Sequence, residues 1–368
     1  MLNPGDARVV RHVLERPGIV RSALAEALDL SAAGAAVMIR GLVRQGVLVE
    51  AGRAPSGGGR RAAQLFVRPE LAHAHAHTVE PGCLRSGVVN LAGEVVASTE
   101  ATLEGAGGFP EAVERNSERL GRAVKRARVV AVVVTAPGLP EPNAPASFRV
   151  PWLFGVRPLD VSSVPSANGA VCLCSNAEAL LRAEAAVDPA MYEERALAVD
   201  LCGGATAYAA WPGAGGLALD LAAFRPAPET MLRAALERKV VEASAEPESD
   251  LGPRLKDTAD AIEALAAAEA EGDPTAAGVV DALTDAIAEL LAGVVRLVRP
   301  SRVLLSCWAV AAGLCSEDAV RRRVRRLCPP GVAEAMSLQF AEPDVWRPAV
   351  GAGLLALGRW LEALESGR

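Results

Sequence analysis

Residues 20–50 read VRSALAEALDLSAAGAAVMIRGLVRQGVLVE, and the order of apolar, turn and capping residues in this stretch decides the N-terminal fold. Apolar residues at helical spacing predict a short helix over Arg21–Leu28. Asp29 follows where a left-handed backbone is often needed, a conformation that aspartate tolerates. Ser31 is a good N-cap for a longer helix that runs to about Gln45. Two helices joined by so tight a turn predict a helix-turn-helix.

The flanking residues extend this unit at both ends. Upstream, a first helix is predicted up to Pro17-Gly18, with an apolar face of Val9, Val10, Val13 and Leu14. Downstream, Gly46 ends the longer helix, whose buried face consists of Ala35, Met38, Ile39 and Leu42. Two β-type stretches, Val47–Glu50 and Gln64–Val67, then enclose the loop Ala51–Ala63. A hairpin after such a helix is a wing, so residues 1–70 are predicted to form a winged helix-turn-helix that binds double-stranded DNA.

The predicted DNA contacts are divided between the longer helix and the wing. Residues 32–36 are only alanine and glycine, which cannot make bidentate hydrogen bonds to base edges. The glycines at 57–59 let the wing backbone approach phosphates, and the two arginines after them suit a narrow minor groove. A solvated, flexible linker is the alternative interpretation of this loop. We expect DNA contacts from Arg21, Ser31, Arg40, Arg44, Arg60 and Arg61.

Charge and composition agree with a DNA-binding module on an acidic body. Residues 1–70 carry ten arginines against six acids, a charge of +4, which leaves −10 on the rest of a chain whose net charge is −6. No apolar run reaches the roughly twenty residues of a membrane span. Charged residues occupy the N-terminal stretch where a signal peptide needs an apolar segment, so we expect a cytoplasmic protein. The seven scattered cysteines are expected to be structural thiols, with a metal site or a disulfide at Cys172 and Cys174 as the alternative.

From residue 71 onward, buried strands alternate with helices, which predicts an α/β body in two lobes. The strands are expected over 88–97 (two, hinged at a turn), 129–134, 170–173, 196–201 and 302–305, and the helices over 110–127, 176–186, 278–298 and 346–364. Residues 243–256, rich in acids and prolines, are expected to form a mobile excursion. We assign residues 71–185 to the first lobe, with the C-terminal helix 346–368 packing back on it. Residues 186–345 form the second lobe, which is expected to mediate dimerisation.

This order of elements resembles the ROK family of repressors and sugar kinases. In the N-terminal part the resemblance rests on Arg21, Leu24-Ala25, Leu30-Ser31, Gly59-Arg60-Arg61 and Leu65. In the body it rests on residues 88–95, Pro137-Gly138, Trp152, the helix ending at Glu184, residues 300–303 and Gly351-Ala352. The resemblance implies a winged helix joined to a two-lobed body of the actin and sugar-kinase type.

Three departures from the family pattern argue against a kinase. The phosphate loop of the family's kinases is replaced by residues 78–83, and their glycine pair near the nucleotide by Ser306-Cys307. Their Asn-Asp pair, which supplies the catalytic base, corresponds to Ser175-Asn176. Because an amide cannot accept a hydroxyl proton, Asn176 cannot serve as the general base of phosphoryl transfer.

The family's zinc motif is also missing, so we expect neither a metal nor another cofactor. It should follow Ala214-Gly215, but no histidine occurs after His77 and Cys202 is isolated between residues 175 and 306. The glutamates and histidine that hold sugar hydroxyls in the family disappear with it, which puts hexose sensing in doubt. His73, His75 and His77 alternate on a predicted strand. A half-exposed strand edge or linker is the preferred interpretation of that row, and a metal site is the alternative.

These observations favour a homodimeric transcriptional regulator, specifically a repressor, on an imperfectly palindromic operator. Its body is expected to be catalytically inactive and to bind a small-molecule effector between the lobes, beside Gly138 and Asn176. The alternative for Asn176 is that it only caps its helix, with the cleft collapsed. A sugar kinase with an appended helix-turn-helix and an architectural DNA binder without an effector are the competing functions.

Overall fold

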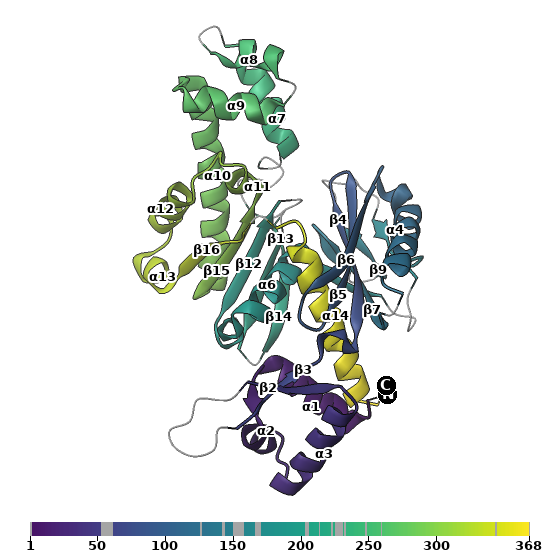
Figure 1. Cartoon of the computed structure of the whole chain (residues 1–368). Helices are drawn as coiled ribbons and strands as arrows, with labels where there is room; N and C mark the ends of the chain where they lie inside the picture. The colour runs from purple at the N-terminus through teal and green to yellow at the C-terminus, as the bar shows by residue number, and fades with distance from the viewer. Residues whose placement is uncertain are drawn as a thin grey trace. The chain divides into compact units, whose positions relative to one another are not determined.

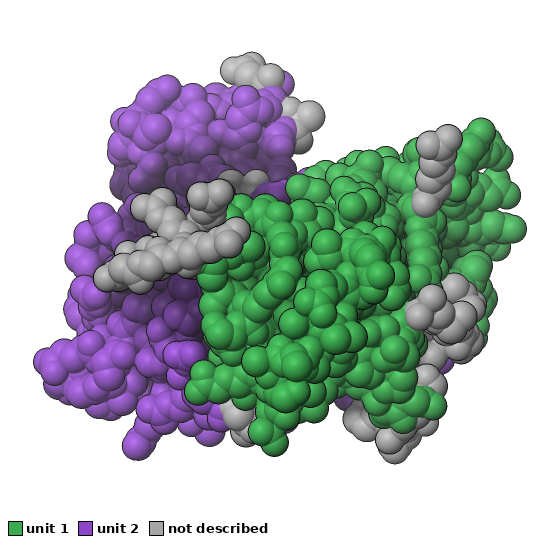
Figure 2. Space-filling model, turned by 60° about the horizontal axis from the view of Figure 1, so that its bottom comes forward, with its two compact units in different colours: residues 1–135, 161–174, 346–368 green, residues 136–160, 175–345 purple. Residues whose placement is uncertain are grey.

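The computed structural model describes residues 2–52, 62–125, 127–141, 144–149, 158–165, 171–202, 206–212, 214–221, 224, 231, 233–246, 249–258, 260–342 and 344–367. The chain divides into two compact units (Figure 2). The first unit comprises residues 1–135, 161–174 and 346–368, and the second comprises residues 136–160 and 175–345. Each unit is a self-contained arrangement of helices and sheets.

The N-terminal part of the first unit, called the head below, is a winged helix-turn-helix (Figure 1). Its elements are α1 (Pro4–Glu15), β1 (Ile19–Val20), α2 (Arg21–Ala27), α3 (Ala32–Arg44), β2 (Leu48–Ala51) and β3 (Gln64–Val67). The three strands form an antiparallel sheet in the order β1-β3-β2. Helices α2 and α3 are bent by 114° relative to each other, within the range of helix-turn-helix motifs.

The predicted turn chemistry of the head is confirmed. Asp29 has a φ of 54°, in the left-handed region, and so reverses the chain between α2 and α3. The Oγ of Ser31 accepts a hydrogen bond from the Gly34 amide at 3.1 Å and caps α3. Helix α1 begins with a capping box in which the Asp6 amide donates to Asn3 Oδ1 at 2.8 Å. Met38, predicted to be buried, is only half-buried and packs at the margin of the head core.

The rest of the first unit is a five-stranded sheet with a helix on each face. Its elements are β4 (His73–Glu80), β5 (Cys83–Asn90), β6 (Val95–Thr102), α4 (Phe109–Ala123), β7 (Val129–Ala136), β11 (Cys172–Ser175) and α14 (Arg347–Glu365). The strand order is β11-β7-β4-β5-β6. On one face, Asn116 of α4 donates a hydrogen bond to Ser86 Oγ at 2.9 Å. On the other, α14 approaches β5 so closely that a Cβ on Gly353 would lie 2.7 Å from Val89 Cβ.

The row of histidines lies on β4, the central strand of this sheet, so the expectation of a half-exposed edge or linker is wrong. His73 and His77 are buried, and His77 Nδ1 lies 2.8 Å from Ser86 Oγ. Burial lowers the pKa of His77 to about 3, which keeps its imidazole neutral. The histidine-bearing face of β4 thus packs in the part of the core that faces α4.

The second unit is built on another five-stranded sheet. Its main elements are α6 (Asn176–Val187), β12 (Ala196–Leu201), β13 (Thr206–Trp211), β14 (Ala214–Asp220), α10 (Pro274–Val298), β15 (Arg302–Cys307), α12 (Glu317–Leu327) and β16 (Ser337–Phe340). The strand order is β14-β13-β12-β15-β16, and β12, β15 and β16 are parallel. Helix α6 covers one face of the sheet, and α10 and α12 pack against the other.

Smaller elements complete the second unit. They are β8 (Leu139–Glu141), β9 (Ala144–Arg149), β10 (Leu159–Asp160), α7 (Arg233–Ala243), α8 (Leu251–Asp257), α9 (Ala261–Ala270), α11 (Trp308–Ala311) and α13 (Pro330–Ala335). The prediction that residues 243–256 form a mobile excursion is wrong for the residues that belong to α8. Leu251 is fully buried, and the Asp250 amide donates to Asp273 Oδ2 at 2.6 Å. In the described ranges, no single helix is long and apolar enough to cross a membrane.

Candidate functional site

The exposed face of α3 presents two arginines and an unexpected valine. Four exposed residues follow one another at helical spacing on this face: Ala33, Val37, Arg40 and Arg44. The side chain of Val37 is 59% exposed. The Nε of Arg44 lies 3.4 Å from the Arg40 carbonyl oxygen, so the two guanidinium groups lie along the same stripe. This is the face that a recognition helix directs into the major groove.

Val37 is a candidate contact that the sequence analysis missed. It lies on the side of α3 opposite the buried Ala35, Ile39 and Leu42. An exposed apolar side chain in a groove-binding helix can contact the methyl group of thymine. The sequence did contain a signal for this contact, because the helical spacing of the buried residues places Val37 on the outer face of α3.

The other predicted DNA contacts have different local roles. Ser31 is exposed, and its hydroxyl caps α3 as described. Arg21 forms an ion pair with Glu50, with its Nε 2.8 Å from Oε1, so it ties the start of α2 to the first wing strand. Arg60 and Arg61 lie outside the described residues. Of the predicted contacts, Arg40 and Arg44 are therefore the arginines that the structure places on the exposed face of α3.

The end of the C-terminal helix completes the head core. Leu361 of α14 is 1% exposed among apolar residues of α1, α2 and α3, and Trp360 and Leu364 pack at the margin of the same cluster. In Figure 1, α14 runs along β4 and β5 and ends beside α1. The same helix thus packs on the five-stranded sheet and on the head.

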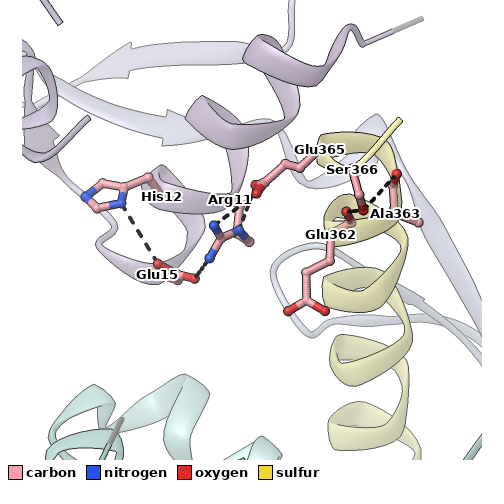
Figure 3. A network of polar contacts seen from close by, with 7 residues as sticks. All are labelled: Arg11, His12, Glu15, Glu362, Ala363, Glu365 and Ser366. Carbon is pink, nitrogen blue, oxygen red and sulfur yellow. Dashed lines mark hydrogen bonds and ion pairs between the residues drawn. The ribbon is translucent and has the colours of Figure 1, made fainter. Parts of the chain in front are cut away.

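A bidentate ion pair fixes this junction (Figure 3). The Nε and Nη2 atoms of Arg11 donate to the two carboxylate oxygens of Glu365 at 2.7 and 3.0 Å. The Nη1 atom of Arg11 also donates to Glu15 Oε1, at 2.8 Å. The hydrogen bond to Glu365 raises the pKa of Arg11. Two parallel bonds hold the guanidinium and carboxylate planes together, which orients α1 against the last turn of α14.

The second unit contains a polar cluster of buried Asn176 and Asp200 with half-buried Ser306. On β12, Leu197, Val199 and Leu201 face α10, so Ala198 and Asp200 face α6. Ser306 is the register partner of Asp200 on the parallel strand β15. Asn176 begins α6 and is 5% exposed, while Asp200 is 4% exposed. The cluster therefore lies at the carboxyl ends of parallel strands, where α/β folds bind ligands.

Burial dominates the electrostatics of this cluster. It raises the pKa of Asp200 to about 6, although hydrogen bonds with the Cys202 amide and with the Ser306 and Asn176 side chains lower it. The Cys202 amide donates to Asp200 Oδ1 at 3.2 Å. Asp200 Oδ2 is buried and has no hydrogen-bond partner within the described part of the chain. A carboxyl group whose ionised form is so poorly stabilised is typical of functional sites.

The cluster changes the interpretation of Asn176. Ser175 caps α6, because its Oγ accepts from the Glu178 amide at 3.2 Å, so the alternative that Asn176 merely caps its helix is wrong. Its side chain instead contacts Asp200. Gly138 is buried in the bend between β7 and β8 and belongs to neither strand. The structure thus links Asn176 to Asp200 and Ser306, and gives no contact of Gly138 with that cluster among the described residues.

Asp200 is a candidate site residue in the body that the sequence analysis missed. The signal was a single acid in the otherwise apolar strand Ala196–Leu201. Together the three side chains offer hydrogen-bond acceptors and donors with at most one charge, which suits a polar, uncharged ligand.

Within the described ranges, no three histidine, cysteine or acidic side chains are grouped as metal ligands. All seven cysteines are free thiols. Cys172 and Cys174, the close pair in the sequence, therefore do not form a disulfide in this structure. Burial also raises the pKa of the Cys307 thiol, to about 12.

No protein-family model and no curated protein matches this sequence. Solved structures match it in fold. A ROK family transcriptional regulator, described as a homologue of the E. coli MLC protein, aligns with a TM-score of 0.72 and 18% identity over 98% of this chain and 97% of its own. A ROK family glucokinase from Streptomyces griseus aligns with a TM-score of 0.61 and 18% identity over 77% of this chain and 99% of its own.

A ROK hexokinase from Thermus thermophilus gives a similar result, with a TM-score of 0.57 and 20% identity over 77% of this chain and 98% of its own. The regulator thus matches nearly the whole chain, whereas the two kinases match a smaller part of it. Identities this low show the fold alone. The fold is that of a winged helix-turn-helix joined to a ROK-type body, as the sequence predicted.

Proposed function

We propose that this chain, whose fold is shared by ROK regulators and kinases, is a DNA-binding transcriptional regulator that acts as a homodimeric repressor. The observation that carries the proposal is the exposed stripe of Val37, Arg40 and Arg44 on α3, in a head with the helix-turn-helix bend. Arginines neutralise phosphates, and Val37 provides an apolar contact for a thymine methyl. The regulator that shares the whole fold supports this proposal.

The dimer follows from the way such heads bind DNA. One head covers a single major-groove half-site, and two heads related by two-fold symmetry cover two half-sites about one helical turn apart. Specific affinity from one head would rest on very few base contacts, since residues 32–36 are alanine and glycine. A second head doubles those contacts.

The Asn176 cluster is the proposed effector site, with Gly138 as a further candidate. Asn176, Asp200 and Ser306 suit a small polar molecule without a negative charge, because an anion would face the Asp200 carboxylate. An effector can alter DNA binding only if it binds one conformation of the body more tightly than another.

Selection of DNA from a random library by the full chain tests the proposed function. We expect enrichment of an imperfect palindrome with A·T pairs opposite Val37 and half-sites about 10 base pairs apart. Placed in a promoter, the selected sequence should lower transcription when the protein is present. Failure to enrich any sequence would refute specific DNA binding, and increased transcription would refute the repressor role.

One observation favours a sugar kinase as the second candidate. Asp200 provides a carboxyl group beside Asn176, with a pKa of about 6, which suits a general base near neutral pH. Its side chain is only 4% exposed, which argues against that role. An ATP-consumption assay with aldohexoses separates the two functions, and we expect no turnover. Turnover that Asp200→Asn abolishes would establish the kinase instead.

A further inference from the structure

The second unit has a surface cavity of about 380 Å³ at the amino-terminal ends of β12 and β15. Its wall includes Arg195, Arg299, Ser301 and the α13 residue Val332. Its volume lies within the range of small-molecule pockets. Arg195 precedes β12 and Asp200 lies near its far end, roughly 16 Å along the strand. The cavity is therefore separate from the Asn176 cluster.

Arg299 adopts a backbone conformation that disfavours its own side chain. It ends α10 with a φ of 49° and a ψ of 56°, in the left-handed region. Glycine is the usual residue at such a helix end, because a Cβ is strained there. Residues held in such sparsely populated conformations cluster at functional sites.

The local carboxylates do not neutralise the two cavity arginines. Arg302, on the adjoining strand, pairs with Asp188 and with both oxygens of Glu194, its Nη2 lying 2.9 Å from Oε1. No carboxylate of the described residues lies within ion-pair distance of Arg195 or Arg299. Both are exposed, on a body that is acidic as a whole.

The backbone holds the two arginines in a fixed relation. The Ser301 amide donates to the Arg195 carbonyl oxygen at 2.9 Å, and the Ser301 hydroxyl donates to the same oxygen at 3.3 Å. The chain segments that carry Arg195 and Arg299 are thus joined by two hydrogen bonds beside the cavity.

We propose that this cavity binds a small organic dianion, either a phosphate monoester or a dicarboxylate, between the guanidinium groups of Arg195 and Arg299. Guanidinium forks recognise both groups by paired hydrogen bonds. Pro300, Val332 and Ala335 in the wall provide apolar contact for the organic part of the ligand. The site is independent of the proposed DNA-binding function.

Thermal unfolding of the full chain tests the site, with glycerol phosphate and succinate as probes and sodium chloride at equal ionic strength as the reference. One or both probes should raise the Tm of the wild type in a saturable way, because a ligand that binds the folded state stabilises it. Arg195→Ala and Arg299→Gly should each weaken the response at least tenfold. Arg296→Ala, one turn earlier on α10, is the matched control and should respond like the wild type.

Arg299→Gly separates binding from structure. Because glycine relieves the strained backbone, this variant should unfold at a higher temperature than the wild type without a probe, and yet lose the response to it. No stabilisation of the wild type beyond sodium chloride would overturn the proposal. A response that persists in the Arg195→Ala, Arg299→Gly double variant would overturn it as well.

Discussion

Leu361→Ala is expected to destabilise the head by about 2–5 kcal/mol, although Leu361 lies close to the C-terminal end of the described chain. Its side chain is 1% exposed within the apolar cluster of α1, α2 and α3, so truncation leaves a cavity there. The bidentate contact of Arg11 with Glu365 holds the same turn of α14 in place, which limits collapse around that cavity. Urea unfolding of the full chain measures the loss.

Amide hydrogen exchange locates the effect. Leu354→Ala is the control, because half-buried Leu354 packs against Gly93, in the turn between β5 and β6, and is not a member of the head cluster. In Leu361→Ala the amides of α1 to α3 should exchange faster, and in Leu354→Ala they should exchange as in the wild type. Equal protection of the head in both variants would show that α14 is not part of its core.

Asp200→Asn is expected to stabilise the second unit at pH 8 by up to about 3 kcal/mol. Burial raises the pKa of Asp200 from 3.8 to about 6. A raised pKa in the folded state means that stability is fully present below pH 4 and falls as the pH rises through 6. The amide is uncharged throughout, so the variant should escape this loss while keeping the oxygen that accepts from the Cys202 amide.

The measurement is the free energy of unfolding of variant minus wild type, from pH 4 to pH 8. The difference should grow across pH 4–6 and level off above it. Glu289→Gln, an exposed acid on α10 without an ion pair among the described residues, is the control and should show no such growth. A difference for Asp200→Asn that stays constant with pH would show that the Asp200 carboxyl is not buried as the structure has it.

The sequence predicted most elements whose local signals are strong. The turn at Asp29, the cap at Ser31 and the strand Ala196–Leu201 all depend on a few neighbouring residues, and the structure confirms them. The strand at His73 was also predicted, but not its central place in the sheet. That place depends on the pairing of β4 with β5 and β7, which join segments far apart in the chain.

The candidate sites were less predictable, because they depend on tertiary contacts. Asp200 and Ser306 are 106 positions apart and meet only through the parallel pairing of β12 with β15. Leu361 joins the head core across almost the whole chain length. Asn176 was identified because the family resemblance pointed to it, yet its partner Asp200 was not. Arg299 gave no sequence signal, since its strained backbone is visible only in three dimensions.

The salt dependence of DNA binding tests the central claim, that this chain binds DNA through α3 and the wing. The affinity of the full chain for its selected DNA is measured over a range of salt concentrations. Four proteins are compared: the wild type, Arg40→Ala/Arg44→Ala, Arg60→Ala/Arg61→Ala, and Arg115→Ala/Arg122→Ala on the exposed face of α4 as a control of equal charge.

The account predicts that each head variant makes the negative slope of log K against log salt shallower by about two to four, because a dimer loses up to four phosphate contacts. The α4 variant should keep the wild-type slope and affinity. Equal slopes in all four proteins would contradict the claim, and the DNA-binding face would then have to lie elsewhere.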